Sequence, residues 1–144
     1  MSDTSRDDNQ PFPSDRQPTI RMVTMPRDTN AAGHIFGGWI MSQMDIAGSI
    51  VAIEHASSRV VTIAVTSMEF HKPVYVGDLV SCFARIEKVG RTSITVQVEV
   101  FAQRNRDANN IIKVTQAVIV YVAVHEDGTP KPLPTRDPDF SHYF

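Results

Sequence analysis

The spacing of apolar residues changes along the chain in an order that predicts one helix and five strands. Residues 19–25 alternate loosely, as in a short strand, and a turn-rich segment follows. From about residue 36 to residue 55, apolar side chains recur all around a helical wheel, which is typical of a buried helix. The period then becomes two, and four further strands are expected, at residues 61–66, 79–88, 94–100 and 111–124.

This order of elements predicts an α+β fold in which an antiparallel sheet curls around one helix. The turns between the strands are short enough for antiparallel neighbours. Such a sheet keeps free edges and a partly apolar outer face, where Phe101, Ile119 and Tyr121 are expected. Self-association as a symmetric dimer is the simplest way to cover these surfaces.

Composition divides the chain into one domain and two tails. Residues 1–17 are polar and charged, which predicts a flexible N-terminal tail. Residues 126–144 hold four prolines, which lack the backbone donor that a regular element needs, and predict a proline-rich C-terminal tail. The aromatic end of this tail leaves docking on the domain, or on a second copy, as an open alternative. Residues 18–125 are long enough for one compact domain.

Charge and cysteine content exclude several classes of protein. Fourteen Lys and Arg against sixteen Asp and Glu give a formal charge of −2, which argues against nucleic-acid binding. The acidic, polar start of the chain is unlike a signal peptide, and no apolar run predicts a membrane span. The single cysteine, Cys82, cannot form an internal disulfide, which favours a reducing, cytoplasmic compartment.

Asp45 is the most unusual residue of the expected helix. It interrupts an apolar run, where an unpaired buried carboxylate would be costly. Its helical neighbours include Ser42, Gly48 and Ser49, so a notch that suits a ligand is expected beside it. The alternative is that Asp45 faces solvent, or bonds to Ser42 or Ser49, and does no chemistry.

Glycines at the start of the same helix point to a second feature. Gly37 and Gly38 allow a ligand to approach free backbone amides at the positive end of the helix dipole. Such amides can polarise a carbonyl and hold a developing oxyanion, although glycines also permit close packing. The sequence contains no motif for a zinc site, a serine triad or a phosphate-binding loop, and no metal is expected.

Four motifs carry a resemblance to a known family. The longest, MPRDTNAAGHIFGGWIMSQMDIAGSIVA, begins at Met25, and RVVT, FHKPVYVGD and VGRTS begin at Arg59, Phe70 and Val89. With these motifs in this order, residues 18–124 resemble the hotdog-fold acyl-CoA thioester hydrolases, in particular the branch of YciA and brain acyl-CoA hydrolase. The resemblance implies a hotdog fold, with a five-stranded antiparallel sheet wrapped around one long central helix, assembled as dimers of hotdogs.

The activity that this resemblance implies is hydrolysis of acyl-CoA to a free carboxylic acid and CoA, at sites between two subunits. The family's catalytic aspartate falls on Asp45, as general base or as nucleophile. Its asparagine falls on Asn30, which is expected to reach Asp45 of the partner subunit. The amides of Gly37 and Gly38 are expected to polarise the thioester carbonyl. No cofactor is implied, since CoA is part of the substrate and product.

The phosphates of CoA require cationic and hydroxyl groups at the entrance of the site. By resemblance, these groups lie in the turn Gly90, Arg91, Thr92 and Ser93, and on Lys72. Ordinary solvated charge is the alternative for Arg91 and Lys72. The expected assembly is a homodimer, built further into a trimer of dimers, with no nucleic-acid or membrane partner.

One departure from the family and two other functions complete the prediction. Many members have Asn-Gly-Asp where this chain has Ala32, Gly33 and His34, so that a titratable base replaces an acid. A non-catalytic acyl-CoA binder or sensor is the alternative function, and the presence of both Asn30 and Asp45 speaks against it. A hotdog hydratase or dehydratase is a third reading, and release of free thiol distinguishes hydrolysis from hydration.

Overall fold

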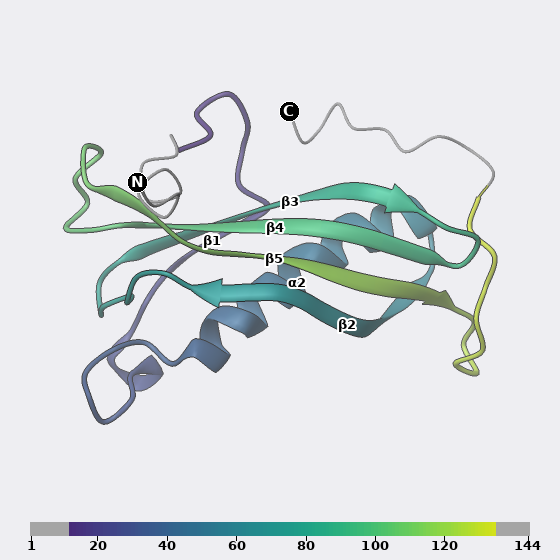
Figure 1. The fold of residues 1–144 in the computed structure, drawn as a ribbon, viewed down its shortest axis with the longest axis horizontal. Helices are drawn as coiled ribbons and strands as arrows, with labels where there is room; N and C mark the ends of the chain where they lie inside the picture. The colour runs from purple at the N-terminus through teal and green to yellow at the C-terminus, as the bar shows by residue number, and fades with distance from the viewer. Residues whose placement is uncertain (1–11, 135–144) are drawn as a thin grey trace.

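One long helix lies against the inner face of a five-stranded antiparallel sheet in the computed structural model, which describes residues 12–134 (Figure 1). The expected hotdog fold is therefore confirmed. The helices are η1, a short 3-10 helix (Pro26–Asp28), and α2 (Gly37–Ala56). The strands are β1 (Ile20–Val23), β2 (Arg59–Phe70), β3 (Leu79–Val89), β4 (Ser93–Gln103) and β5 (Ile111–Val124).

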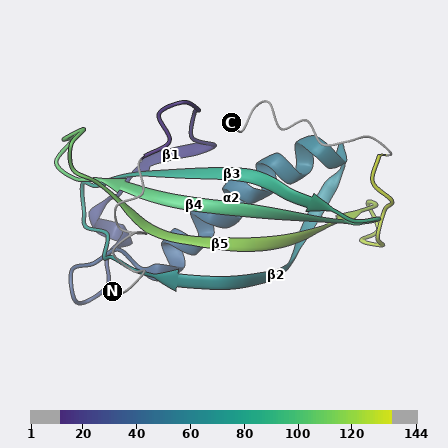
Figure 2. The same cartoon turned by 45° about the horizontal axis from the view of Figure 1, so that its top comes forward.

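The strand order β1-β3-β4-β5-β2 makes β1 and β2 the two edges of the sheet (Figure 2). The strand that follows the helix therefore pairs with the last strand of the chain, and all pairs are antiparallel. The pairing of β2 with β5 shifts between Thr62 and Ala64 and again between Thr66 and Glu69. Such irregularities change which side chains of a strand face inward.

The core lies between α2 and the inner face of the sheet. Ile40, Met44, Ala47 and Val51 line the buried side of the helix and join a cluster from all strands except β1 and β2. The helix ends at a residue in the left-handed conformation, Ser57, whose N–H donates to the Ile53 carbonyl at 2.8 Å. These contacts hold the long axis of α2 along the sheet. The start and the end of the helix therefore lie at opposite ends of the strands.

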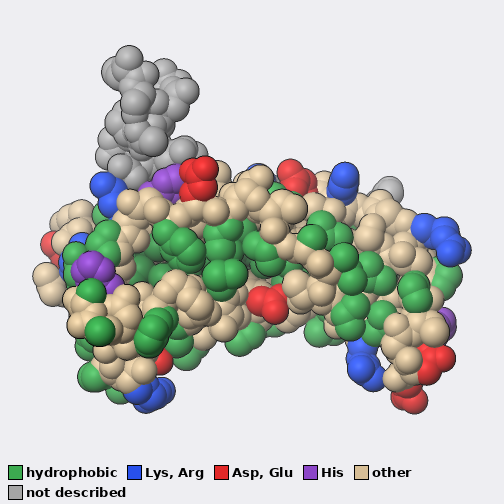
Figure 3. Space-filling view, turned by 60° about the horizontal axis from the view of Figure 1, so that its bottom comes forward, with side chains coloured by type: hydrophobic (Ala, Val, Ile, Leu, Met, Phe, Trp, Pro, Cys, Tyr) green, Lys and Arg blue, Asp and Glu red, His purple; other side chains and the backbone are tan. Residues whose placement is uncertain are grey.

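The expectation of a helix buried on most sides is only partly right, because one side of α2 stays exposed beside β2. Three side chains of α2 and three from residues 61–65 of β2 are between 39% and 59% exposed. We name these six residues the apolar face: Met41, Ile46, Ile53, Val61, Ile63 and Val65. Figure 3 shows hydrophobic side chains gathered over this side of the molecule. A long edge strand with an apolar surface is a common site of association.

The outer face of the sheet differs from the prediction. Phe101 lies there but is only 1% exposed, because Phe83 and Phe12 cover it edge-on at centroid distances of 5.8 and 5.5 Å. Ile119 and Tyr121 instead belong to the core cluster beneath the helix, so their expected outer position was wrong. The physical reason is that β5 is apolar on both faces, and its period does not indicate which face meets α2.

Both expected tails contribute ordered residues to the domain. Within residues 1–17, Phe12 packs on the outer face and Arg16 forms a 3.1 Å ion pair with Glu99. Within residues 126–144, the N–H of Leu133 donates to the Arg91 carbonyl at 2.9 Å, and the Leu133 side chain is only 8% exposed. The aromatic residues considered for docking, Phe140, Tyr143 and Phe144, lie outside the described residues.

Candidate active site

Two hydroxyl groups of the sheet hold the Asp45 carboxylate. Thr62 Oγ1 donates to Asp45 Oδ1 at 2.8 Å, and Tyr121 Oη lies 3.0 Å from the same oxygen and 2.8 Å from the Asp45 carbonyl oxygen. The hydroxyls of Ser42 and Ser49 donate instead to carbonyls of their own helix. The alternative in which Asp45 bonds to one of these serines is therefore excluded.

The two donors come from neighbouring strands and form a directly opposed pair. Thr62 of β2 lies opposite Tyr121 of β5 in the antiparallel register, so the two side chains share the face that meets α2. The register shift immediately after Thr62 coincides with the exposed Ile63. Bulges of this kind often lie beside active sites, where they redirect a side chain.

Tyr121 fills the notch that the sequence predicts beside Asp45. A Cβ atom placed on Gly48 would lie 2.3 Å from Tyr121 Oη, so the absent side chain makes room for the hydroxyl. The sequence predicts an open ligand site here. The structure shows instead that a core side chain occupies the notch. Burial raises the pKa of Tyr121 most, and the charge of Asp45 and the hydrogen bond to it raise this pKa further, so the hydroxyl stays protonated.

Asn30, Gly37 and Lys72 meet at a separate pocket of about 290 Å³ at the start of α2. The pocket is also lined by His34, Phe70 and His71. Asn30 Oδ1 accepts backbone N–H bonds from Ala32 at 2.9 Å and His34 at 3.1 Å, which folds this loop around the amide. Three of the predicted site residues are thus brought together without Asp45.

The first amides of α2 face away from the helix and have no partner within residues 12–134. Phe36 precedes the helix in an extended conformation, with no side-chain cap. No hydrogen bond from the N–H of Gly37 or Gly38 to another described residue is present. The Phe70 ring would lie 3.5 Å from a Cβ atom on Gly37, whereas a Cβ atom on Gly38 would meet open space. These amides can donate hydrogen bonds to an oxygen of a ligand from outside the chain.

Asp45 lies too far along the helix to share a small ligand group with these amides in one chain. It stands eight positions after Gly37, which corresponds to about 12 Å along the helix axis. The free amides also point away from the body of the helix. Within one chain, the Asp45 site and the pocket at the helix start are therefore two separate groups of predicted site residues.

The turn Gly90–Ser93 lies still farther from the helix start. It is at the end of the sheet where β2 begins, whereas Gly37 contacts Phe70 at the end of β2 (Figure 1). Twelve residues of an extended strand place these ends about 35 Å apart. The turn is closed by a 2.7 Å bond from the Gly90 N–H to the Ser93 carbonyl, and the Thr92 carbonyl accepts the N–H of Ala123 at 2.9 Å.

The exposed Arg91 makes no ion pair with another residue of the described part of the chain. Lys72 is also exposed, at the opposite end of the domain. The structure thus does not bring these two predicted CoA contacts together within one chain.

An ion pair between the buried Asp78 and the partly exposed Arg104 supports residues 72–78, the loop that carries Lys72. The Asp78 carboxylate accepts bonds from the Tyr75 N–H at 3.0 Å and from both Nε and Nη2 of Arg104, at 3.3 and 3.1 Å. Arg104 also lies over the Tyr75 ring at 4.6 Å, and the His34 ring meets the edge of that tyrosine at 5.1 Å. His34, the departure from the family, therefore packs beside this supported loop.

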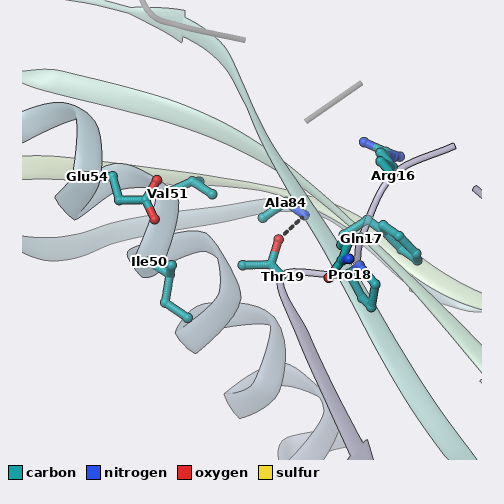
Figure 4. Close-up of a pocket in the computed structure, with 9 residues that line it drawn as sticks. Arg16, Gln17, Pro18, Thr19, Ile50, Val51, Glu54 and Ala84 are labelled. Atoms are coloured by element: carbon teal, nitrogen blue, oxygen red, sulfur yellow. Dashed lines mark hydrogen bonds between the residues drawn. The ribbon is translucent and has the colours of Figure 1, made fainter. Parts of the chain in front are cut away.

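A pocket of about 500 Å³ lies elsewhere, at the edge of the sheet (Figure 4). It is lined by residues 16–19, by Ile50, Val51 and Glu54 of α2, and by Phe83 and Ala84. None of the site residues predicted from the sequence lines it. Among residues 12–134, no three His, Cys, Asp or Glu side chains are grouped so that they could hold a metal ion. No helix in this part of the chain is long and apolar enough to cross a membrane.

Comparison with known proteins assigns this fold and site to a class. The pattern of the thioesterase superfamily matches residues 32–108. The chain is 48% identical to a hexameric hotdog-fold thioesterase of Campylobacter jejuni of known structure, with a TM-score of 0.77 over 82% of this chain and 90% of that one. An acyl-CoA hydrolase of Staphylococcus aureus, solved with butyryl-CoA and CoA, is 30% identical, with a TM-score of 0.73 over 80% and 70% of the two chains.

A further relative indicates which type of thioesterase this chain resembles. The acyl-CoA thioester hydrolase YciA of Salmonella typhimurium is 50% identical over 119 residues, which span 81% of this chain and 90% of the relative. The protein belongs to the acyl-CoA thioester hydrolase family of the YciA type, as the four sequence motifs imply.

Proposed function

We propose that this protein hydrolyses acyl-CoA to a free carboxylic acid and CoA, with Asp45 as the reacting carboxylate. The observation that carries the proposal is a partly exposed carboxylate in mid-helix, held on one oxygen by two hydroxyls, in a chain half identical to an acyl-CoA thioester hydrolase. Asn30, Gly37 and Gly38 complete the catalytic set. Hydrolysis requires no cofactor beyond the CoA of the substrate.

A second relative supports the roles of Asp45 and Thr62. For the Staphylococcus aureus acyl-CoA hydrolase, structures of an aspartate-to-alanine variant and of a threonine-to-alanine variant are known, and the two positions are 17 apart. In this chain Thr62 follows Asp45 by the same 17 positions and donates a hydrogen bond to it. Thr62 is a site residue that the strand period alone does not single out.

The chemistry follows from a carboxylate beside a polarised thioester. As a general base, Asp45 takes a proton from water, whose oxygen attacks the thioester carbon; the carbon–sulfur bond then breaks, and the CoA thiolate takes up the proton. As a nucleophile, Asp45 forms a mixed anhydride with release of CoA, and water then hydrolyses the anhydride. A single turnover in heavy-oxygen water tests the nucleophilic route: label in Asp45 demonstrates a mixed anhydride that water opens at the aspartyl carbonyl, whereas the general-base route places the label only in the product acid.

We further propose that each active site combines two copies of the chain. One copy provides Asn30, the amides of Gly37 and Gly38, and Lys72, and the other provides Asp45. The argument is the separation of about 12 Å between Asp45 and Gly37 on one rigid helix, which no thioester carbonyl can span. Two antiparallel helices related by a two-fold axis bring opposite ends together.

The apolar face is the proposed contact between the copies. Its residues flank the Asp45 site: Met41 precedes Asp45 by one helical turn, and Val61 and Ile63 flank Thr62. If the β2 edges of two copies pair about a two-fold axis, the turn Gly90–Ser93 of one copy approaches the helix start of the other. Arg91 and Lys72 then face the same CoA from different copies.

The expected complete assembly is a trimer of dimers, in the cytoplasm. The hexameric state of the Campylobacter jejuni relative supports it, and light scattering checks it with a mass near 96 kDa, six times the 16.0 kDa of the chain. A reducing compartment suits the lone Cys82, which is buried and whose pKa burial raises to about 12.

Release of free thiol tests the proposed activity. Wild type and Asp45→Asn are compared on a series of acyl-CoAs from acetyl to palmitoyl. Release by wild type alone, with both proteins binding acyl-CoA, supports hydrolysis through Asp45 and gives the chain-length preference. Binding without release by either protein would favour the sensor.

A further inference from the structure

We propose that Tyr121 is a positioning residue for the reaction, and that Gly48 exists to admit it: the pair fixes Oδ1 of Asp45 so that Oδ2 is the oxygen that reacts. This inference rests on the proposed function of Asp45. It adds a residue pair to the site that neither the motifs nor the relatives' names indicate.

The two oxygens of Asp45 have different surroundings. Oδ1 lies 2.8 Å from Thr62 Oγ1 and 3.0 Å from Tyr121 Oη, and both groups are hydrogen-bond donors. Oδ2 accepts no hydrogen bond from a residue of the described range 12–134. Two donors on one oxygen fix the plane of the carboxylate and draw charge toward that oxygen, so the other oxygen is directed away from the sheet.

Tyr121 reaches Asp45 only because position 48 has no side chain. Tyr121 is fully buried in the last third of β5, and its ring carbons Cε2 and Cζ would lie 3.0 Å from a Cβ atom on Gly48. Its hydroxyl would lie at 2.3 Å, so even an alanine there displaces the donor. A glycine inside a helix costs about 1 kcal/mol relative to alanine, and room for the tyrosine is the gain that offsets it.

The hydroxyl has two acceptors on the same residue. Its single proton can point to Oδ1 at 3.0 Å or to the Asp45 carbonyl oxygen at 2.8 Å. When Asp45 carries a proton or an acyl group during turnover, Oδ1 becomes a weaker acceptor. The tyrosine proton then turns to the carbonyl oxygen, and the buried ring stays in place through the cycle.

The first test is Tyr121→Phe, which removes the hydroxyl and keeps the ring. We expect kcat to fall roughly tenfold or more, as for loss of a hydrogen bond to a charged group, with KM changed less than about threefold. A fall in kcat at a nearly unchanged KM is the sign of a positioning role, because lost packing alone would not separate the two constants. Thr62→Val removes the other donor, and the double variant should show non-additive losses because both hydroxyls act on Oδ1.

Tyr75→Phe is the matched control, since it removes a tyrosine hydroxyl on a half-exposed ring of the supported loop. It should leave kcat and KM unchanged. Gly48→Ala should reproduce the loss seen for Tyr121→Phe, and should add little in a Tyr121→Phe background, where no hydroxyl remains to displace. If Gly48→Ala fails to fold, the kcat and KM of Tyr121→Phe decide.

The outcomes separate this inference from the proposed function. If Asp45→Asn is inactive while Tyr121→Phe keeps the wild-type kcat and KM, the positioning role is wrong and the catalytic role of Asp45 stands. If Asp45→Asn still hydrolyses acyl-CoA, the proposed function itself fails. A lower melting temperature of Tyr121→Phe with unchanged kcat would reduce Tyr121 to a packing residue and overturn the inference.

Discussion

Two aspartates, Asp45 and Asp78, are held in opposite ways. Asp78 is 2% exposed, and its two carboxylate oxygens accept bonds from a backbone N–H and from the charged Arg104. Asp45 is partly exposed and is held by neutral hydroxyls at one oxygen only. Asp78 therefore holds a loop in place through both of its oxygens, whereas Asp45 keeps one oxygen available for chemistry.

The difference shows how a carboxylate is kept reactive within an apolar setting. An arginine partner stabilises a buried carboxylate but occupies the acceptors on both of its oxygens. Neutral hydroxyls on one oxygen fix the direction of the group and leave the other oxygen available to a substrate or water. An aspartate thus supports the structure where its hydrogen-bond donor is arginine, and is available for reaction where its donors are hydroxyls.

The largest expected effect is that of Asp45→Asn. We expect kcat to fall about a thousandfold or more, because a group that acts only in the transition state is lost. The free energy of unfolding should change little, since the asparagine oxygen still accepts from Thr62 and Tyr121. Thiol release and urea unfolding of the same preparation measure both. If Asp45→Asn is much less stable but still active, Asp45 has a structural role like that of Asp78, and the catalytic role is wrong.

The converse is expected of Asp78→Ala. Removing Asp78 takes away the charge partner of the partly exposed Arg104 and the acceptor of the Tyr75 N–H, and should lower the free energy of unfolding by about 2 kcal/mol. Urea unfolding checks this value. Replacing Arg104 by leucine in the same chain should recover part of the loss, and an unchanged stability of Asp78→Ala would show that the pair does not support the loop.

High pH should lower the free energy of unfolding through Tyr121, the residue that binds Asp45. Its pKa is raised in the folded chain above the usual value of 10.0, mainly by burial, so the folded state holds this proton when the unfolded state has lost it. Stability from this group is thus fully present below pH 10 and falls above it, by up to about 1.4 kcal/mol per pH unit. Cys82, whose pKa is also raised, adds a similar dependence above pH 9.

Unfolding of wild type and Tyr121→Phe between pH 8 and pH 11 isolates the contribution of Tyr121. The difference in stability between the two proteins should shrink as the pH rises above 10. Tyr75→Phe, on the supported loop, serves as the control. A pH-independent difference would mean that the Tyr121 hydroxyl is not held protonated beside Asp45.

The smallest effect is expected at Arg91, the exposed counterpart of Arg104. Arg91→Ala should raise KM a few-fold with kcat unchanged, because it removes one charge contact with CoA phosphates. Higher salt should reduce the difference from wild type. Steady-state kinetics at two salt concentrations check this, and a fall in kcat at unchanged KM would remove Arg91 from CoA binding.

The sequence allowed the elements and Asp45 to be predicted, but not the partners of Asp45. The helix and four strands have clear periods, and a carboxylate in an apolar helix is conspicuous. Tyr121 is different: β5 is apolar on both faces, so nothing local indicates which residues face the helix. Gly48 suggested an open notch because sequence spacing does not reveal what a neighbouring strand inserts.

Thr62 shows a second limit of the period. Alternation groups Val61, Ile63 and Val65 apart from Thr62 and Thr66, but it does not state which group faces the core. In the structure the bulge after Thr62 breaks the alternation, so Thr62 and Val65 both oppose core residues, Tyr121 and Ile119, while all three apolar residues are at least 39% exposed. Thr62 reaches Asp45 because a bulge in an edge strand changes which side chains share a face.

Mixing two inactive variants tests the account's central claim most directly, namely that Asp45 acts in a site completed by a second copy. Asn30→Ala and Asp45→Asn are co-expressed with different tags, and the mixed oligomers are purified through both. Each variant alone should be nearly inactive, whereas hexamers that carry both tags should regain about a quarter of the wild-type sites, since about half of their dimers are mixed and each mixed dimer holds one intact site. Mixed oligomers that form but stay inactive would contradict the account.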